Sequence, residues 1–241
     1  MMIDNHVHVG WFRDGYHSPL EVRISVKKAG IDKCVVSSTS TCADLYHNIL
    51  TEFHQLISIA GIENVKPLLW ISPNMIIKKW HLKKLLNSKI EWKGVKLHYI
   101  SHPQFSKHKE WVNTAIVIAY SLGNVPVLFH TGEWDTCHAG IFESLIDSHP
   151  KLKFVLAHGR PIDETIYLMK KYPNAWTDTA FMSIENIKKL KQENLTDRVL
   201  FGSDAPINRI YVPELSTTDY LKTRIQAIKN IDPSILENSI Y

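Results

Sequence analysis

Short apolar runs recur along the chain, and each is followed by a longer segment with the hydrophobic spacing of an amphipathic helix. The runs are rich in β-branched and aromatic residues, and they have the usual length of strands. We predict eight strands, over residues 3–9, 33–39, 65–71, 94–99, 126–131, 153–158, 175–181 and 198–204.

Helical segments separate these strands, and one of them carries a clear start signal. Ser18 has the features of a helix cap, Pro19 follows at the first helical position, and Glu21 stands three residues after the cap. Eight strand-then-helix units in 241 residues fit a (β/α)8 barrel, which usually takes about 250 residues, better than an open doubly wound sheet. No linker-like stretch interrupts the chain, so we predict a single α/β barrel domain over residues 1–241.

Polar residues stand where the predicted strands end, which is where (β/α)8 barrels carry their active sites. His6 and His8 lie two apart on the first strand, so their side chains point to the same face. Two exposed strand histidines would give the same triplet, so the pair is weak evidence alone. The other strand ends supply Lys96, His98, His130, His158 and Asp204.

These residue types suit a metal site. Neutral imidazoles together with a carboxylate are typical ligands of zinc, and they also accept manganese, iron or cobalt. We therefore expect a divalent metal cofactor, with zinc as the first choice. No G-x-G-x-x-G or G-x-x-x-x-G-K-[ST] motif follows a strand, which argues against nucleotide binding.

The order of these motifs resembles the amidohydrolase superfamily, in particular the amidohydrolase-2 branch of metal-dependent TIM-barrel hydrolases and decarboxylases. The resemblance spans the chain. It rests on DNHVH (4–8), GVKLH (94–98), LFHTG (128–132), LAHG (156–159) and LFGSDAP (200–206).

The resemblance implies a role for each strand-end residue. His6, His8 and His130 would be metal ligands, and Asp204 would be a ligand or the catalytic carboxylate. His158 would bind a second metal or the reacting substrate. In such a site Asp204 takes the proton of metal-activated water, and His158 stabilises the oxyanion or passes a proton to the leaving group.

Lys96 could have one of several roles. Some branches of the superfamily carry a carboxylated lysine on the fourth strand that bridges two metals, whereas GVKLH also resembles a branch in which the lysine is no bridge. A mononuclear centre is favoured. An ion pair at the barrel mouth is the structural alternative.

Three arginines, Arg13, Arg160 and Arg209, follow strands on the predicted catalytic face and together suggest an anionic substrate, although each alone also fits a loop salt bridge. Lys96, His98 and Trp134 are further candidate substrate contacts. We predict hydrolysis of a C–N or C–O bond, in an amide or a lactone or ester, of a small carboxylated substrate. The alternatives are a metal-dependent decarboxylase of an aromatic or unsaturated acid, and a binding protein that kept the barrel without turnover.

Composition excludes some partners. The formal net charge is only +4 and the lysines are scattered, so nucleic-acid binding is not expected. Cys34, Cys42 and Cys137 form no C-x-x-C pair and leave an odd thiol, which favours a reducing compartment. Because no leader or long apolar run is visible, we predict a cytoplasmic protein without a membrane partner, and leave a homodimer open.

Overall fold

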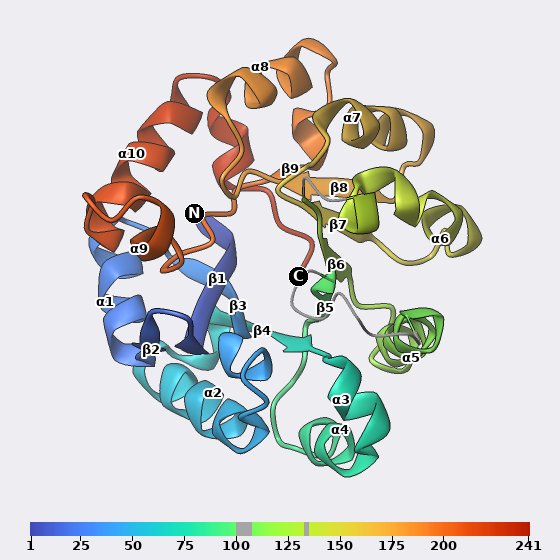
Figure 1. Cartoon of the computed structure of the whole chain (residues 1–241). Helices are drawn as coiled ribbons and strands as arrows, with labels where there is room; N and C mark the ends of the chain where they lie inside the picture. Colours follow the sequence, from blue (N-terminus) through green and yellow to red (C-terminus); the bar gives the residue numbers. More distant parts are fainter. Residues whose placement is uncertain (100–107, 133–134) are drawn as a thin grey trace.

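The structure, a computed structural model, describes residues 1–99, 108–132 and 135–241. Within these residues one sheet curls into a barrel, and helices surround it (Figure 1). Eight strands run parallel in chain order: β1 (Ile3–Phe12), β3 (Lys33–Ser38), β4 (Val65–Trp70), β5 (Gly94–Leu97), β6 (Val127–His130), β7 (Phe154–Ala157), β8 (Ala175–Asp178) and β9 (Val199–Leu200). The predicted eight-stranded α/β barrel is confirmed, with each strand within a few residues of its predicted range.

The helices follow the strands in alternation. Ser18 and Pro19 begin the first helix as predicted, although the Ser18 side chain makes no capping hydrogen bond. The helices are α1 (Pro19–Lys28), α2 (Tyr46–Ala60), α3 (Pro73–Ile77), α4 (Lys79–Leu86), α5 (His108–Ser121), α6 (Glu143–Ser148), α7 (Ile162–Lys171), α8 (Ile184–Gln192), α9 (Asn208–Tyr211) and α10 (Thr217–Lys229). Among the described residues, no helix combines the length and the apolar character needed to cross a membrane.

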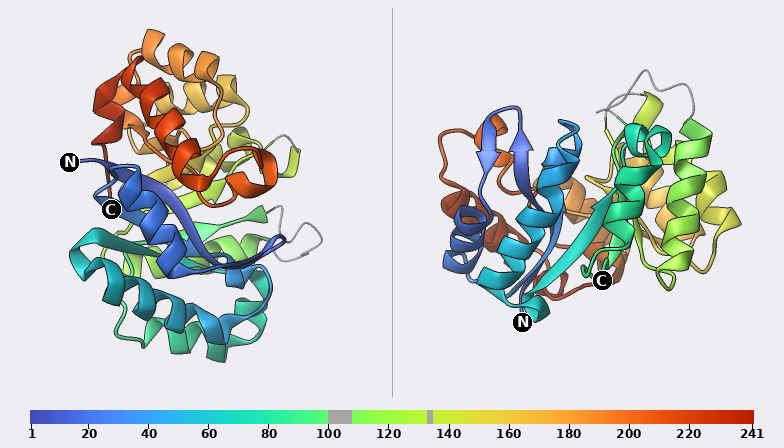
Figure 2. Two further views of the ribbon diagram at one scale, coloured as in Figure 1. Left: turned by 90° about the vertical axis from the view of Figure 1, so that its left-hand side faces the viewer. Right: turned by 90° about the horizontal axis from the view of Figure 1, so that it is seen from below.

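Backbone hydrogen bonds between β1 and the segment after β9 close the barrel. Asn5 N donates to Phe201 O at 2.7 Å, Asp204 N donates to His6 O at 2.8 Å, and His8 N donates to Ala205 O at 2.7 Å. This short ladder places Asp204 directly beside the two histidines of β1. Figure 2 shows both chain termini at the opposite end of the barrel from the start of the hairpin that follows β1.

The two-residue period of the strands separates an outer core from a small inner one. Leu68, Leu128, Val155 and Leu200 fill the barrel interior, whereas their sequence neighbours pack against the helices. Residues two positions further along the same strands therefore also face inward, at the carboxyl end. That register brings His130 to the barrel mouth, two residues after Leu128.

One strand was not predicted. β1 continues to Phe12 and turns back into β2 (Gly15–His17), which pairs antiparallel with it and raises a hairpin above the barrel. Gly10 has a φ of 99°, and a Cβ there would lie 2.6 Å from Ser40 Oγ, so the close approach requires glycine. The pattern of only three residues in β2 is too short to signal a strand.

A buried carboxyl group fastens this hairpin to α2. Glu52 accepts hydrogen bonds from Ser38 Oγ at 2.5 Å and from Ser40 Oγ at 2.6 Å, and Ser40 Oγ in turn accepts one from Trp11 N at 3.0 Å. Burial raises the pKa of Glu52 above its ordinary value, although the two serine hydroxyls oppose this.

This raised pKa predicts a pH-dependent stability. The folded protein holds the Glu52 proton at pH values where the unfolded chain has lost it, so the free energy of unfolding should fall as the pH rises from about 4.5 through the raised pKa. Glu52→Gln should flatten that slope in urea unfolding measured at several pH values. Glu63→Gln, on an exposed residue, is the control, and an unchanged slope in Glu52→Gln would contradict the assignment.

Candidate metal centre

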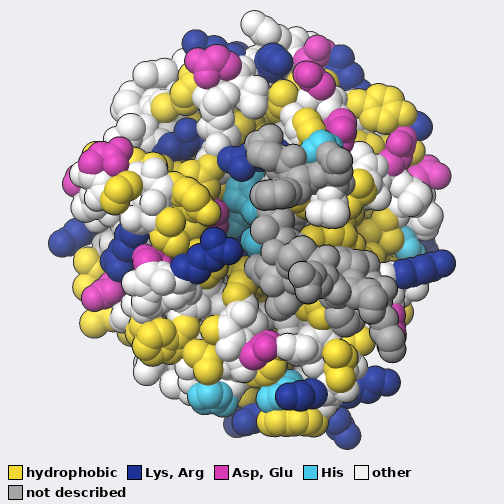
Figure 3. Space-filling view, viewed as in Figure 1, with side chains coloured by type: hydrophobic (Ala, Val, Ile, Leu, Met, Phe, Trp, Pro, Cys, Tyr) yellow, Lys and Arg dark blue, Asp and Glu magenta, His cyan; other side chains and the backbone are white. Residues whose placement is uncertain are grey.

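Three predicted metal ligands meet at the barrel mouth. His6, His8 and Asp204 are buried, and they offer one ligand atom each within 4.8 Å of one another. Asp204 Oδ1 lies 2.8 Å from His8 Nε2 and 3.4 Å from His6 Nε2. Histidine side chains gather at the centre of this face of the molecule (Figure 3).

The hydrogen bonds at the rear of both rings fix which nitrogen faces the site. His6 Nδ1 lies 2.8 Å from Asp178 Oδ2, a carboxylate oxygen that accepts its proton. His8 Nδ1 lies 3.3 Å from Ser37 O, a carbonyl that can only accept, and 3.0 Å from Ser37 Oγ. Both Nε2 atoms therefore face the site beside Asp204 Oδ1 and Lys96 Nζ, and a ring that is held at Nδ1 and presents Nε2 is the arrangement that metal-binding histidines use.

The charge states also suit a cation. Burial lowers the pKa of His8 to about 3, so the ring is neutral near pH 7. Burial alone would raise the pKa of Asp204, but its interactions with the neighbouring His6 and His8 side chains outweigh burial and hold that pKa well below its usual range. An ionised carboxylate beside two imidazoles is a donor set for zinc and for other first-row divalent ions.

Lys96 marks the place where a cation fits. Its Nζ lies 2.8 Å from His6 Nε2 and 3.2 Å from His8 Nε2, and 4.6 Å from the centroid of the Trp70 ring. Burial lowers the pKa of Lys96 to about 8, so at pH 7 the group is mainly an ammonium that donates to both lone pairs. The two imidazoles thus already converge on a positive charge, and the donors fit a divalent metal.

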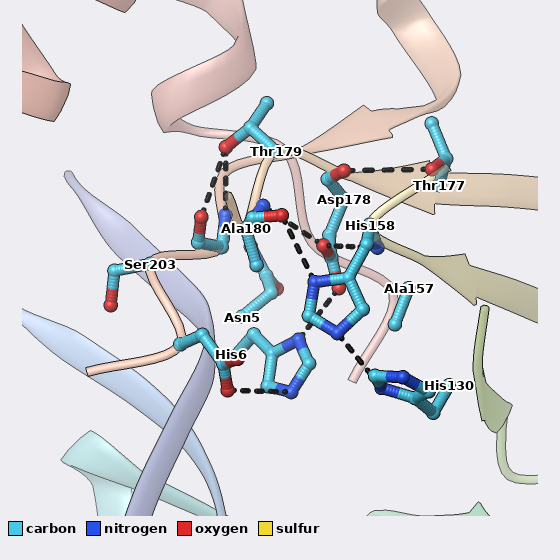
Figure 4. Close-up of polar contacts among 12 residues, drawn as sticks. Asn5, His6, His130, Ala157, His158, Thr177, Asp178, Thr179, Ala180 and Ser203 are labelled. Carbon is cyan, nitrogen blue, oxygen red and sulfur yellow. Dashed lines mark hydrogen bonds and ion pairs between the residues drawn. The ribbon is translucent and has the colours of Figure 1, made fainter. Parts of the chain in front are cut away.

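A second group of rings continues from the trio along the mouth. His158 Nδ1 lies 3.0 Å from Ala180 O, and His158 Nε2 lies 3.1 Å from His130 Nδ1 (Figure 4). The His130 ring stacks on His98 with centroids 3.9 Å apart, and His98 stacks on Trp70 at 5.2 Å. Burial lowers the pKa of His158 to about 4 and lowers those of His98 and His130 well below their usual range.

A carboxyl group from the start of β1 joins the two segments that carry the trio. Asp4 Oδ1 accepts from His6 N at 3.2 Å and from Ser203 N at 3.0 Å, and Asp4 Oδ2 accepts from Ser203 Oγ at 2.6 Å. These hydrogen bonds hold Ser203, the residue before Asp204. Asp204 has a φ of 61°. Burial raises the pKa of Asp4 to about 7, and the hydrogen bonds from Ser203 oppose that rise.

Part of this chain is similar to a known protein family. A family model described as amidohydrolase matches residues 93–210. Similar solved structures include a probable 2-pyrone-4,6-dicarboxylic acid hydrolase from Acinetobacter baumannii with citric acid bound, at 14% identity, with 98% of this chain and 95% of that chain covered and a TM-score of 0.67. The chain is thus similar to the amidohydrolase family over residues 93–210, and it shares the fold of that hydrolase.

Two further structures share the barrel fold of this chain. The IDCase of Metarhizium anisopliae in its apo form is 12% identical, over 96% of this chain and 92% of that chain, with a TM-score of 0.62. A 2,6-dihydroxybenzoate decarboxylase complexed with 2,6-dihydroxybenzoate is 13% identical, over 96% and 97%, with a TM-score of 0.50. A search of the curated proteins found no match. The predicted resemblance to amidohydrolases is confirmed over residues 93–210, and these similarities support the prediction of an enzyme.

The other predicted residues lie in several places. His130 and His158 contact each other beside the trio, and their ligand roles stay predictions. Arg160 Nη2 donates to Phe181 O at 3.2 Å, and Arg209 Nη2 lies 3.8 Å from Glu21 Oε2 on α1. Arg13 is exposed in the hairpin turn, and Trp134 lies outside the described residues.

Two residues of this site were missed by the sequence analysis. Asp178 ends β8, on the same strand face as Trp176, which packs against the inner core. Trp70 ends β4, on the same face as Leu68. The two-residue period could have found both, because it places each on the inner face at a strand's carboxyl end.

Proposed function

We propose that this protein is a metal-dependent hydrolase of the amidohydrolase type that cleaves a C–N or C–O bond, in an amide or in a lactone or ester, of a small organic substrate. The observation that carries the proposal is the convergence of His6 Nε2, His8 Nε2 and the ionised Asp204 carboxylate at the barrel mouth. Those three side chains would hold the ion, with His130 as the predicted fourth ligand. Zinc is the first choice for the ion because of the donor set.

The chemistry that such an ion supplies is Lewis acidity, which lowers the pKa of water to about 7 and polarises a carbonyl oxygen. Asp204 is ionised and buried, so it is placed to take the proton of the attacking water. Asp178 keeps the His6 ring in one orientation through its bond to Nδ1. The closely packed rings of Trp70, His98 and His130 limit the entry of bulk water along this side of the mouth.

We also propose that the substrate carries a carboxylate. Arg160 supports this, since it follows His158 by two residues and its guanidinium donates to Phe181 O, just after the carboxyl end of β8. Arg209 is directed to Glu21, 3.8 Å away, which leaves it less suited to that task.

The test first measures the metal bound to the protein and then its hydrolytic activity. Protein purified without chelator should contain about one equivalent of a divalent ion, and should hydrolyse members of a panel of lactones and amides with and without a carboxylate. Chelation should abolish the activity, and zinc should restore it. Protein that binds no divalent ion would contradict the proposal.

Decarboxylation of an aromatic or unsaturated acid is the second candidate. It is favoured by the likeness to a structure described as a 2,6-dihydroxybenzoate decarboxylase and by the same metal-binding trio. Aromatic acids in the same panel separate the two reactions, because only decarboxylation releases carbon dioxide.

A further inference from the structure

Four consecutive carbonyl groups after β8 each accept a hydrogen bond from a side chain. Arg224 Nη2, on α10, donates to Thr179 O at 2.7 Å and to Met182 O at 3.0 Å. Between them, Ala180 O accepts from His158 Nδ1 and Phe181 O accepts from Arg160 Nη2. We call residues 179–182 the β8 loop.

The β8 loop and Asp178, which precedes it, carry the rear partners of two site histidines. Asp178 Oδ2 accepts from His6 Nδ1, and Ala180 O accepts from His158 Nδ1. Asp178 Oδ1 also accepts from His158 N and from Ala180 N, both at 3.0 Å. A shift of this short segment would therefore move both acceptors at once.

These acceptors determine where the ring protons sit. Because a carbonyl only accepts, His158 Nδ1 carries the proton, and in the neutral ring Nε2 is then an acceptor. His130 Nδ1 must in turn donate to His158 Nε2, which leaves the lone pair of His130 on its own Nε2. The hydrogen bond to Ala180 O therefore determines the protonated nitrogen of His158 and, through His158, that of His130.

The guanidinium that holds this segment is costly to bury. Its Nε is buried without a hydrogen-bond partner, and within the described residues Arg224 forms no ion pair. Burial lowers the pKa of Arg224 below its ordinary value. A methionine of similar length would avoid this cost, so stability alone gives little reason for an arginine here.

We propose that Arg224 is a positioning residue of the metal centre: it holds the β8 loop so that Asp178 and Ala180 O set the protonated nitrogens of His6 and His158. The inference rests on the proposed function only in that the centre binds a metal. Rear partners of metal-binding histidines typically change metal affinity by about 10- to 100-fold when they are lost.

The chain offers a matched control for this role. Arg198 Nη1 donates to Tyr172 O at 3.0 Å and to Ala175 O at 3.3 Å, so it also ties two carbonyls, but at the amino end of β8. Arg224→Met and Arg198→Met each remove a guanidinium that bridges two carbonyls beside the same strand. Only Arg224→Met is expected to disturb the site.

The experiment reads the ring protons and the metal separately. In metal-free protein, two-bond proton–nitrogen NMR correlations should show protonated Nδ1 in His6 and His158 of the wild type and of Arg198→Met. In Arg224→Met those signals should move towards a mixture of the two tautomers, and zinc affinity should fall by about tenfold. Arg224→Lys, which keeps a charged donor, should lose about threefold and serves if Arg224→Met does not fold.

The outcomes separate the two proposals. Wild-type tautomers and zinc affinity in Arg224→Met, or in Arg224→Lys if the first variant is unfolded, would overturn the role of Arg224. Equal losses in the Arg224 and Arg198 variants would also overturn it, because they would show a general effect on the barrel. A wild type that binds no zinc would contradict the proposed function, while the NMR comparison would still decide the role of Arg224.

Discussion

Asp204→Asn should reduce kcat by about a hundredfold or more, because the amide keeps the shape of the carboxylate but cannot take a proton. The carboxylate is held ionised by His6 and His8 and stands beside both Nε2 atoms, where the attacking water would bind. KM should change much less than kcat, since substrate binding does not depend on this proton transfer. Steady-state kinetics on a hydrolysed member of the lactone and amide panel measures both constants.

The metal content of the variant has to be measured beside its kinetics, because Asp204 is also a candidate ligand. At saturating zinc, a hundredfold loss with the ion still bound assigns the loss to the missing base. Asp163→Asn on α7, whose side chain is 86% exposed, is the matched control and should keep full activity. Full turnover by metal-loaded Asp204→Asn would place the base elsewhere, with His158 as the next candidate.

The barrel was predictable because its signals are local. Each strand is a short apolar run that ends in a polar residue, and the two-residue period that buries Leu128 also directs His130 to the mouth. The conjunction of His6, His8 and Asp204 followed from the rule that parallel strands of a barrel share one catalytic end. In the structure, the backbone hydrogen bonds between β1 and the segment after β9 bring these three residues together at that end.

Pairings across long stretches of chain were not predictable, because nothing local encodes them. His6 and Asp178 are 172 residues apart in sequence, and Lys96 and His6 are 90 apart. The sequence marked Lys96 as a residue of the mouth but not as the group that donates to both imidazoles. That contact needs coordinates, since it depends on how β1 and β5 face each other across the barrel.

Loss of both β1 ligands should abolish metal-dependent stabilisation of the protein. A ligand that binds only the folded state at 100 times its Kd stabilises it by about 2.7 kcal/mol, which for a chain of this size raises Tm by about 5–10 °C. We expect that rise when zinc is added to chelator-treated wild type, and none in the His6→Asn, His8→Asn double variant. Differential scanning calorimetry with and without zinc measures the difference.

The comparison has to be the shift on adding zinc rather than the absolute Tm, because the double variant also removes the two acceptors of the Lys96 ammonium. A buried ammonium without acceptors destabilises the metal-free protein by itself. The control is the double variant His47→Asn, His54→Asn, which changes two exposed histidines of α2 and should keep the full shift. An equal zinc-induced shift in the β1 variant would place the bound metal outside the trio, and with it the site of the reaction.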